Sequence, residues 1–114
     1  MAPEGGVHEP IYRKEHAMPT YISLLHFTQQ GVEKIKDSPA SLDRAKEAIK
    51  MAGGEMKAYY LTMGQYDAVV IAEAPSDEVY TSMLLATART GAIRTETLRA
   101  FTEEEYRKIV VGIP

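Results

Sequence analysis

Three side chains with acid–base or anion-binding chemistry fall in two segments whose polarity alternates, as it does in β-strands. His26 lies near the end of the first segment, and Arg94 and Glu96 occupy alternate positions of the second. If the two strands are neighbours, the histidine can act as a base, the arginine can clamp an anion and the glutamate can orient the imidazole. These three residues are the candidates for a catalytic site.

A structural explanation accounts for the same residues. Arg94 and Glu96 share one face of their strand and can form an ion pair between subunits, and charges at a sheet edge also prevent wrong strand pairing. His26 then simply ends its strand in solvent. No nucleophile motif accompanies the histidine. We therefore favour the structural explanation and assign no catalytic residue.

A second group of polar residues lies in a predicted β-hairpin turn. Gly64 can adopt a positive φ there, and the Asp67 side chain can accept hydrogen bonds from N–H groups of the turn. Turn chemistry explains the glycine and the aspartate, so we favour a structural turn at Gly64 and Asp67. It explains Tyr66 less well, because a tyrosine beside a carboxylate can also orient a polar ligand.

Tyr59 and Tyr60 are consecutive in a predicted strand and point to opposite faces, so one of them faces the space next to the sheet. Packing between subunits is the favoured explanation, because tyrosine is enriched at interfaces. The alternative is a small organic ligand in that space. The residues that we expect to contact such a ligand are Tyr60, Tyr66, Asp67, Thr95 and Thr97.

Composition excludes several classes of protein. The chain has 114 residues, a formal net charge of −3 and no cysteine. We expect no nucleic-acid partner, because the sequence has no basic stripe to neutralise phosphates. We expect no membrane partner, since no apolar run approaches the about 20 residues that span a bilayer. The three histidines have no metal-ligand spacing, so we predict no metal or cofactor. They are His8, His16 and His26. We predict a cytoplasmic protein, because the sequence shows neither a membrane span nor the apolar region of a signal peptide.

The strands and helices follow a duplicated order. Strands are predicted at residues 20–28, 55–63, 67–74 and 92–101. Ser38, followed by Pro39, is the expected N-cap of the first long helix. Ser76 is expected to cap the second long helix, and a capping box at 102–105 starts a short C-terminal helix. The predicted inner stripe of the second long helix is Val79, Met83, Ala86 and Thr90.

This βαββαβ order predicts an α+β fold, a ferredoxin-like two-layer sandwich with a four-stranded antiparallel sheet and a short C-terminal helix. The expected strand order is 4-1-3-2. The two long helices cover one face of such a sheet, yet the first strand carries apolar residues on both faces. We therefore expect the second face to pack against another copy, as in a dimeric α+β barrel.

The domain is predicted to begin at Met18 and to run to residue 114. Residues 1–17 contain scattered proline, glycine and charge without a sustained period. We interpret them as an N-terminal extension, of the kind that can lie as an arm on a neighbouring subunit.

Several separated segments carry a resemblance to a known family. They are residues 18–21 (MPTY), 36–39 (KDSP), 60–67 (YLTMGQYD), 73–75 (EAP) and 94–101 (RTETLRAF). Together they resemble the GYD domain family, whose pattern of glycine, any residue, tyrosine and aspartate matches Gly64, Tyr66 and Asp67. The resemblance covers residue 18 to about residue 110. It implies a ferredoxin-like, dimeric α+β barrel protein and brings no set of catalytic residues with it.

Three functions remain open from the sequence. The favoured one is a homo-oligomeric small-molecule-binding or accessory protein that uses the space between two sheets. The second is a cofactor-independent small enzyme of oxygenase or isomerase type, with a site near His26 and the strand at Arg94–Thr97. The third is a purely structural assembly module. A pocket with convergent polar groups between the sheets favours the first two, and a packed interface favours the third.

Overall fold

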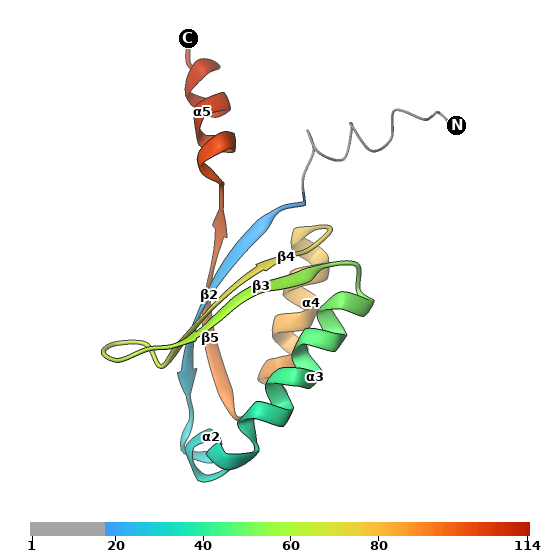
Figure 1. The fold of residues 1–114 in the computed structure, drawn as a ribbon, viewed down its shortest axis with the longest axis vertical. Helices are drawn as coiled ribbons and strands as arrows, with labels where there is room; N and C mark the ends of the chain where they lie inside the picture. The colour runs from blue at the N-terminus through green and yellow to red at the C-terminus, as the bar shows by residue number, and fades with distance from the viewer. Residues whose placement is uncertain (1–17) are drawn as a thin grey trace.

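The computed structural model describes residues 18–114, so the predicted N-terminal extension at 1–17 lies outside the described residues. The elements follow the predicted order (Figure 1). The strands are β2 (Thr20–Phe27), β3 (Glu55–Leu61), β4 (Ala68–Glu73) and β5 (Ile93–Ala100). The helices are α2 (Gln29–Glu33), a 3-10 turn (Ile35–Asp37), α3 (Ser38–Met51), α4 (Asp77–Ala88) and α5 (Glu103–Val111).

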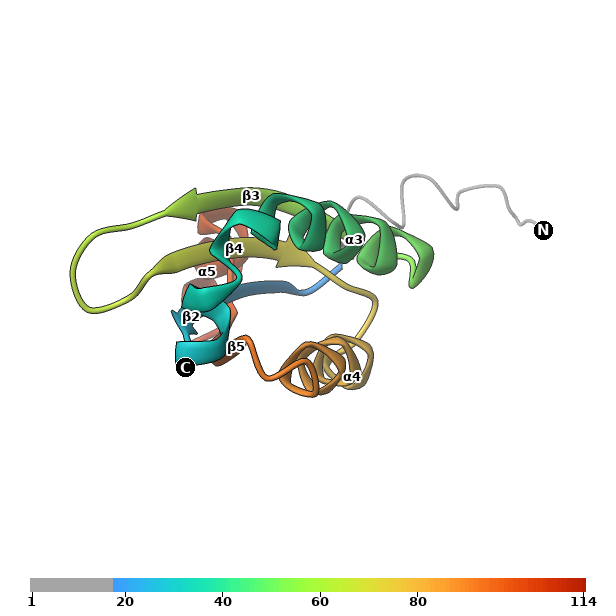
Figure 2. The ribbon, with the colours of Figure 1, turned by 90° about the horizontal axis from the view of Figure 1, so that it is seen from below.

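The four strands form one antiparallel sheet in the order β3-β4-β2-β5, which is the predicted order. β2 is central because it pairs with both β4 and β5. The helices α3 and α4 lie on the same side of this sheet (Figure 2). The prediction of an α+β, ferredoxin-like fold with a C-terminal helix is therefore confirmed, and the dimer stays a prediction.

Alternation along β2 separates the two faces of the sheet. Tyr21, Ser23 and Leu25 are buried on the face that carries the helices, whereas Ile22 and Leu24 are half-buried on the other face. Residues paired across strands share a face, so the same division extends to β4 and β5. The buried hydrophobic core consists of Tyr21, Leu25, Ile49, Ala68, Val70, Ala72, Ala74 and Tyr80.

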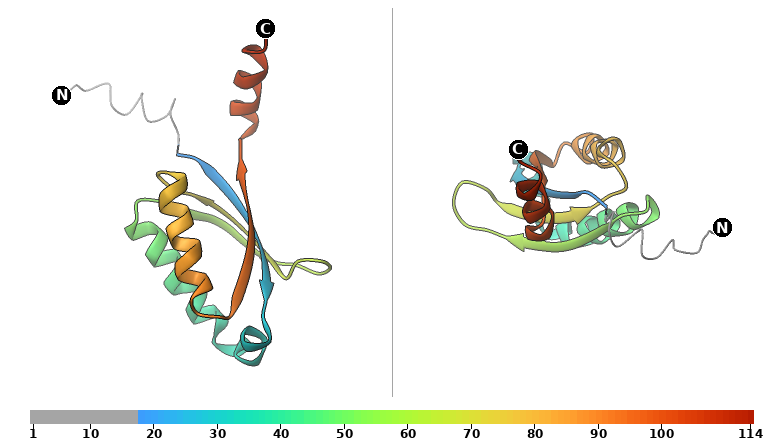
Figure 3. Two further views of the ribbon diagram at one scale, coloured as in Figure 1. Left: turned by 180° about the vertical axis from the view of Figure 1, so that it is seen from behind. Right: turned by 90° about the horizontal axis from the view of Figure 1, so that it is seen from above.

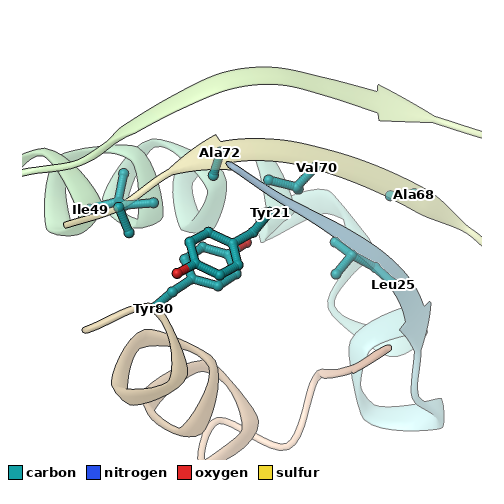
Figure 4. Close-up of a cluster of buried hydrophobic side chains, with 8 residues drawn as sticks. Tyr21, Leu25, Ile49, Ala68, Val70, Ala72 and Tyr80 are labelled. Carbon is teal, nitrogen blue, oxygen red and sulfur yellow. The ribbon is translucent and has the colours of Figure 1, made fainter. Parts of the chain in front are cut away.

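The inner face of α4 differs from the predicted one. Ala86 and Thr90 are exposed, so their placement on the inner stripe is wrong, whereas Met83 does pack against the core. Tyr80 is buried instead, and its ring stacks on Tyr21 at a centroid distance of 4.4 Å (Figure 4). An aromatic ring buries far more apolar area than alanine or threonine does. Tyr80 therefore sets the rotation of the helix.

The start of α3 also differs. Ser38 is the first helical residue and Asp37 holds the cap position, without a side-chain capping bond. The Ser38 hydroxyl instead donates to the carbonyl of Ile35 at 2.6 Å. The reason is that the 3-10 turn runs directly into α3, so the backbone is already helical at Ser38 and its hydroxyl caps the turn.

We call the face of the sheet opposite α3 and α4 the open face. None of the helices between residues 18 and 114 lies over it (Figures 1 and 2). The hairpin between β3 and β4 projects away from α3 and α4 (Figure 2), and α5 stands beyond the end of β5 (Figure 3). In the described part of the chain, no helix has the length and apolar character needed to cross a membrane.

Candidate functional site

The β3–β4 hairpin is closed by a six-residue connection at 62–67. Gly64 has a φ of +101°, a conformation that glycine adopts without the steric cost of a Cβ. The backbone N–H of Thr62 donates to the carbonyl of Asp67 at 2.9 Å, and the Thr62 hydroxyl donates to the carbonyl of Tyr66 at 2.6 Å. These bonds hold Tyr66 and Asp67 in a fixed place at the base of the turn.

Asp67 ties the hairpin to the central strand. Its carboxylate accepts a hydrogen bond from the backbone N–H of Phe27 at 2.9 Å, and its own N–H donates to the carbonyl of Leu25 at 2.9 Å. The sequence predicted acceptance from N–H groups of the turn itself. Its acceptor role is instead toward β2, and its backbone N–H extends the β2–β4 ladder by one residue before the start of β4.

Tyr66 extends from the same turn over the open face. Its hydroxyl donates to Glu96 at 3.2 Å, and its ring lies 5.0 Å from the ring of His26. Desolvation raises the pKa of the Tyr66 phenol above its ordinary value, and the negative charge of Glu96 raises that pKa further. The phenol is therefore kept as a neutral hydrogen-bond donor.

Glu96 also meets His26. Nε2 of His26 lies 3.1 Å from Oε2 of Glu96, across the β2–β5 pair. A carboxylate only accepts hydrogen bonds, so this geometry requires the imidazole proton on Nε2. In the neutral ring, Nδ1 then carries the lone pair. We call His26, Tyr66 and Glu96 the open-face cluster.

The structure brings some predicted site residues together and separates others. Arg94 lies directly opposite His26 in the strand register, on the open face. Tyr60 pairs with Val69 and is 60% exposed on the same face. The candidates His26, Arg94, Glu96 and Tyr66 therefore share one end of the open face, and Tyr60 lies on that face across β4.

Thr95 and Thr97 are on the opposite side of the sheet. Thr95 pairs with buried Leu25, and the Thr97 hydroxyl lies 2.8 Å from that of Ser23. The Ser23 hydroxyl also bonds the hydroxyl of Tyr80 at 2.8 Å. A ligand on the open face is thus separated from both threonines by the thickness of the sheet.

A second polar group was not foreseen from the sequence. The Tyr21 hydroxyl donates to Asp77 at 2.5 Å, and Nε of Arg99 lies 3.9 Å from the same carboxylate oxygen. The Arg99 guanidinium also lies 4.5 Å from the centre of the Phe101 ring. Burial, followed by the bond to Asp77, raises the pKa of Tyr21 to about 12. The sequence could have indicated part of this group, because alternation places Tyr21 and Arg99 on the same face of adjacent strands.

The open-face cluster presents an imidazole lone pair, a phenol and a carboxylate at exposed positions of the sheet. Two shallow hollows lie elsewhere, one against α4 and one between α3 and β3. Between residues 18 and 114, no set of three or more histidine, aspartate and glutamate side chains is arranged to hold a metal ion.

Comparison with known proteins identifies the family of the chain. The family model described as "GYD domain" matches residues 21–110, which is most of the chain. A Thermus thermophilus protein named "Glutamine synthetase and cystathionine beta-lyase binding protein" is 30% identical over 84 residues, which cover 73% of this chain and 88% of that protein. The match to the family model spans most of the chain, so the chain belongs to the GYD domain family.

Proposed function

We propose that this chain is a homodimeric accessory protein that binds a metabolic enzyme, and that two copies associate through their open faces. The observation that carries the proposal is the open face itself. Ile22 and Leu24 of β2 lie there beside Val69 and Ile71 of β4, and no described helix covers them. An apolar sheet face of this kind is typical of a protein interface.

Exposure of individual side chains supports the same conclusion. Leu98, paired with Ile22 on the open face, is 52% exposed, and Tyr60 is also exposed there. The residues between 18 and 114 expose more large hydrophobic side chains than they bury. A second copy placed on the open face would remove the apolar area of Leu98 and Tyr60 from water, and burial of apolar area is the main favourable term in protein association.

The choice of an enzyme as partner rests on the relative from Thermus thermophilus, whose name describes binding to glutamine synthetase and cystathionine β-lyase. The match covers 73% of this chain and 88% of that protein, so most of the folded domain is matched. We therefore take the glutamine synthetase of the organism that produces this chain as its first candidate partner. The cystathionine β-lyase of that organism is the second.

The test is to titrate each purified enzyme with the purified chain and to follow binding by isothermal titration calorimetry. Light scattering after size exclusion then gives the composition of any complex. We expect a defined complex with at least one enzyme at micromolar concentrations, and none with an unrelated enzyme of similar size. Absence of binding to both enzymes would contradict the proposed partner class. The proposed dimer is tested separately, by the molar mass of the chain alone in solution.

A second candidate function is favoured by the open-face cluster. His26, Tyr66 and Glu96 lie within hydrogen-bonding or ring contact of one another. In an open-face dimer they would border the space between the sheets, where a small organic ligand can bind. Native mass spectrometry of protein purified from its own host tests this function, because a retained ligand adds mass to the oligomer. A retained ligand that His26→Ala abolishes would favour a site at the cluster.

A further inference from the structure

The helix α5 has no packing partner in the described part of the chain. None of its residues is buried, and the helix stands beyond the end of β5 (Figure 3). At its base, Arg99 contacts both the Asp77 carboxylate and the Phe101 ring. The chain therefore presents α5 away from its own core.

Local interactions favour helix formation at its start. The Thr102 side chain accepts from the backbone N–H of Glu105, and the Glu105 side chain accepts from that of Thr102, which completes a capping box. Arg107 forms an ion pair with Glu103 one turn away. A helix of nine residues is nevertheless marginal in water without tertiary packing.

The apolar residues of α5 form one stripe. Tyr106, Ile109 and Val110, continued by Ile113 after the helix end, follow the spacing i, i+3, i+4 and i+7. This spacing places them on a single face. Their exposed fractions are 60%, 51%, 44% and 64%. Such a stripe is typical of a helix that packs against an apolar surface.

We propose that the apolar stripe of α5 docks on a second copy of this chain, so that each subunit of the dimer is clasped by the C-terminal helix of the other. This inference rests on the proposed open-face dimer and assigns a further part of its interface. The surface that we assign to the stripe is the part of the partner's open face that the facing sheet leaves uncovered.

The geometry of β5 argues for the second copy over the helix's own sheet. Ala100 pairs with Thr20 at the end of the sheet where β2 begins, and α5 continues outward from that end. The apolar residues of its own open face lie back along the strands, behind the base of the helix. A partner sheet placed on the open face would instead bring uncovered apolar surface alongside α5.

In a two-fold dimer, each copy gives one helix and receives one, so the contact closes and is made twice. Leu98 on the open face and the stripe also belong to consecutive elements, β5 and α5, and both are exposed. The open face and α5 would thus form two parts of one interface.

Two matched variants of α5 test the contact. Ile109→Ser removes a stripe residue, whereas Val111→Ser removes an apolar residue from the opposite side of the same helix, where it is 84% exposed. We expect Ile109→Ser to raise the dimer dissociation constant by about tenfold or more and Val111→Ser to change it less than about twofold. Equal effects of the two variants, or none, would overturn the proposal.

Hydrogen exchange of the α5 amides identifies the occupant. We expect slow exchange in the wild-type dimer and fast exchange in a Leu98→Glu variant, in which a charge on the open face disrupts association. Slow exchange in a monomeric variant would show that α5 packs on its own chain. If deletion of residues 1–17 then removed this protection, the stripe would be assigned to that segment. Both results would overturn the proposal. A wild-type dimer with unprotected α5 overturns the clasp alone, whereas a monomeric wild type overturns the dimer as well.

Discussion

The carboxylate of Asp67 accepts a hydrogen bond of 2.9 Å from the backbone N–H of Phe27, a residue on the central strand. The backbone N–H of Asp67 donates at the same time to Leu25. Together with the positive φ of Gly64 and the contact of Tyr66 with Glu96, this bond gives the Gly-x-Tyr-Asp pattern a physical explanation. Glycine makes the turn, aspartate fastens it to β2, and tyrosine reaches the open face.

Replacement of Asp67 should weaken the fold. Asp67→Ala leaves the Phe27 N–H without its acceptor, so we expect the free energy of unfolding to fall by about 1–3 kcal/mol. Asp67→Asn keeps an oxygen acceptor and should cost less. Urea denaturation of both variants measures the difference. Equal losses in the two variants would show that the hydrogen bond to Phe27 contributes little.

Gly64 tests backbone conformation without crowding. A Cβ at this position would meet nothing within 4 Å, so the cost of Gly64→Ala comes from the positive φ alone. We expect a loss of about 1 kcal/mol, and a smaller one for Gly64→Asn, because asparagine tolerates the left-handed region. A neutral Gly64→Ala variant in thermal unfolding would contradict this explanation of the turn.

Gly31 tests the opposite case. Its φ is not positive, but a Cβ built there would lie 2.2 Å from the carbonyl oxygen of Ala92, which is backbone and cannot swing away. We expect Gly31→Ala to lose about 2 kcal/mol despite the better helix propensity of alanine, and thus more than Gly64→Ala. The same denaturation series compares the two. A smaller loss at Gly31 would mean that the α2 region shifts freely.

The raised pKa of Tyr21 predicts a loss of folding stability at alkaline pH. This pKa is about 12 in the folded chain and about 10 in an unfolded one, so the folded state retains the proton longer. This contribution to stability is complete below about pH 10 and is lost as pH rises from about 10 to 12. Tyr21→Phe lacks it, and its Tm should fall less steeply over that interval. Parallel slopes for variant and wild type would contradict the assignment.

The sequence predicted where the strands lie along the chain, because alternation and turn residues are local signals. It could not place Thr95 and Thr97, because alternation separates them from Arg94 and Glu96 without telling which set faces the helices. That choice depends on the register of β5 with β2, where Thr97 meets Ser23. The rotation of α4 was missed for a similar reason, since Tyr80 is fixed by stacking on Tyr21, a contact between distant segments.

The central claim, a dimer formed through the open face, is tested most directly by sedimentation velocity on the wild type and two matched variants. Leu98→Glu places a charge on the open face, and Ala45→Glu places the same charge on the exposed surface of α3. We predict a dimer, or a multiple of two chains, for the wild type and Ala45→Glu, and a folded single chain for Leu98→Glu. A wild type that sediments as one chain, or a Leu98→Glu variant with the wild-type assembly, would contradict the claim.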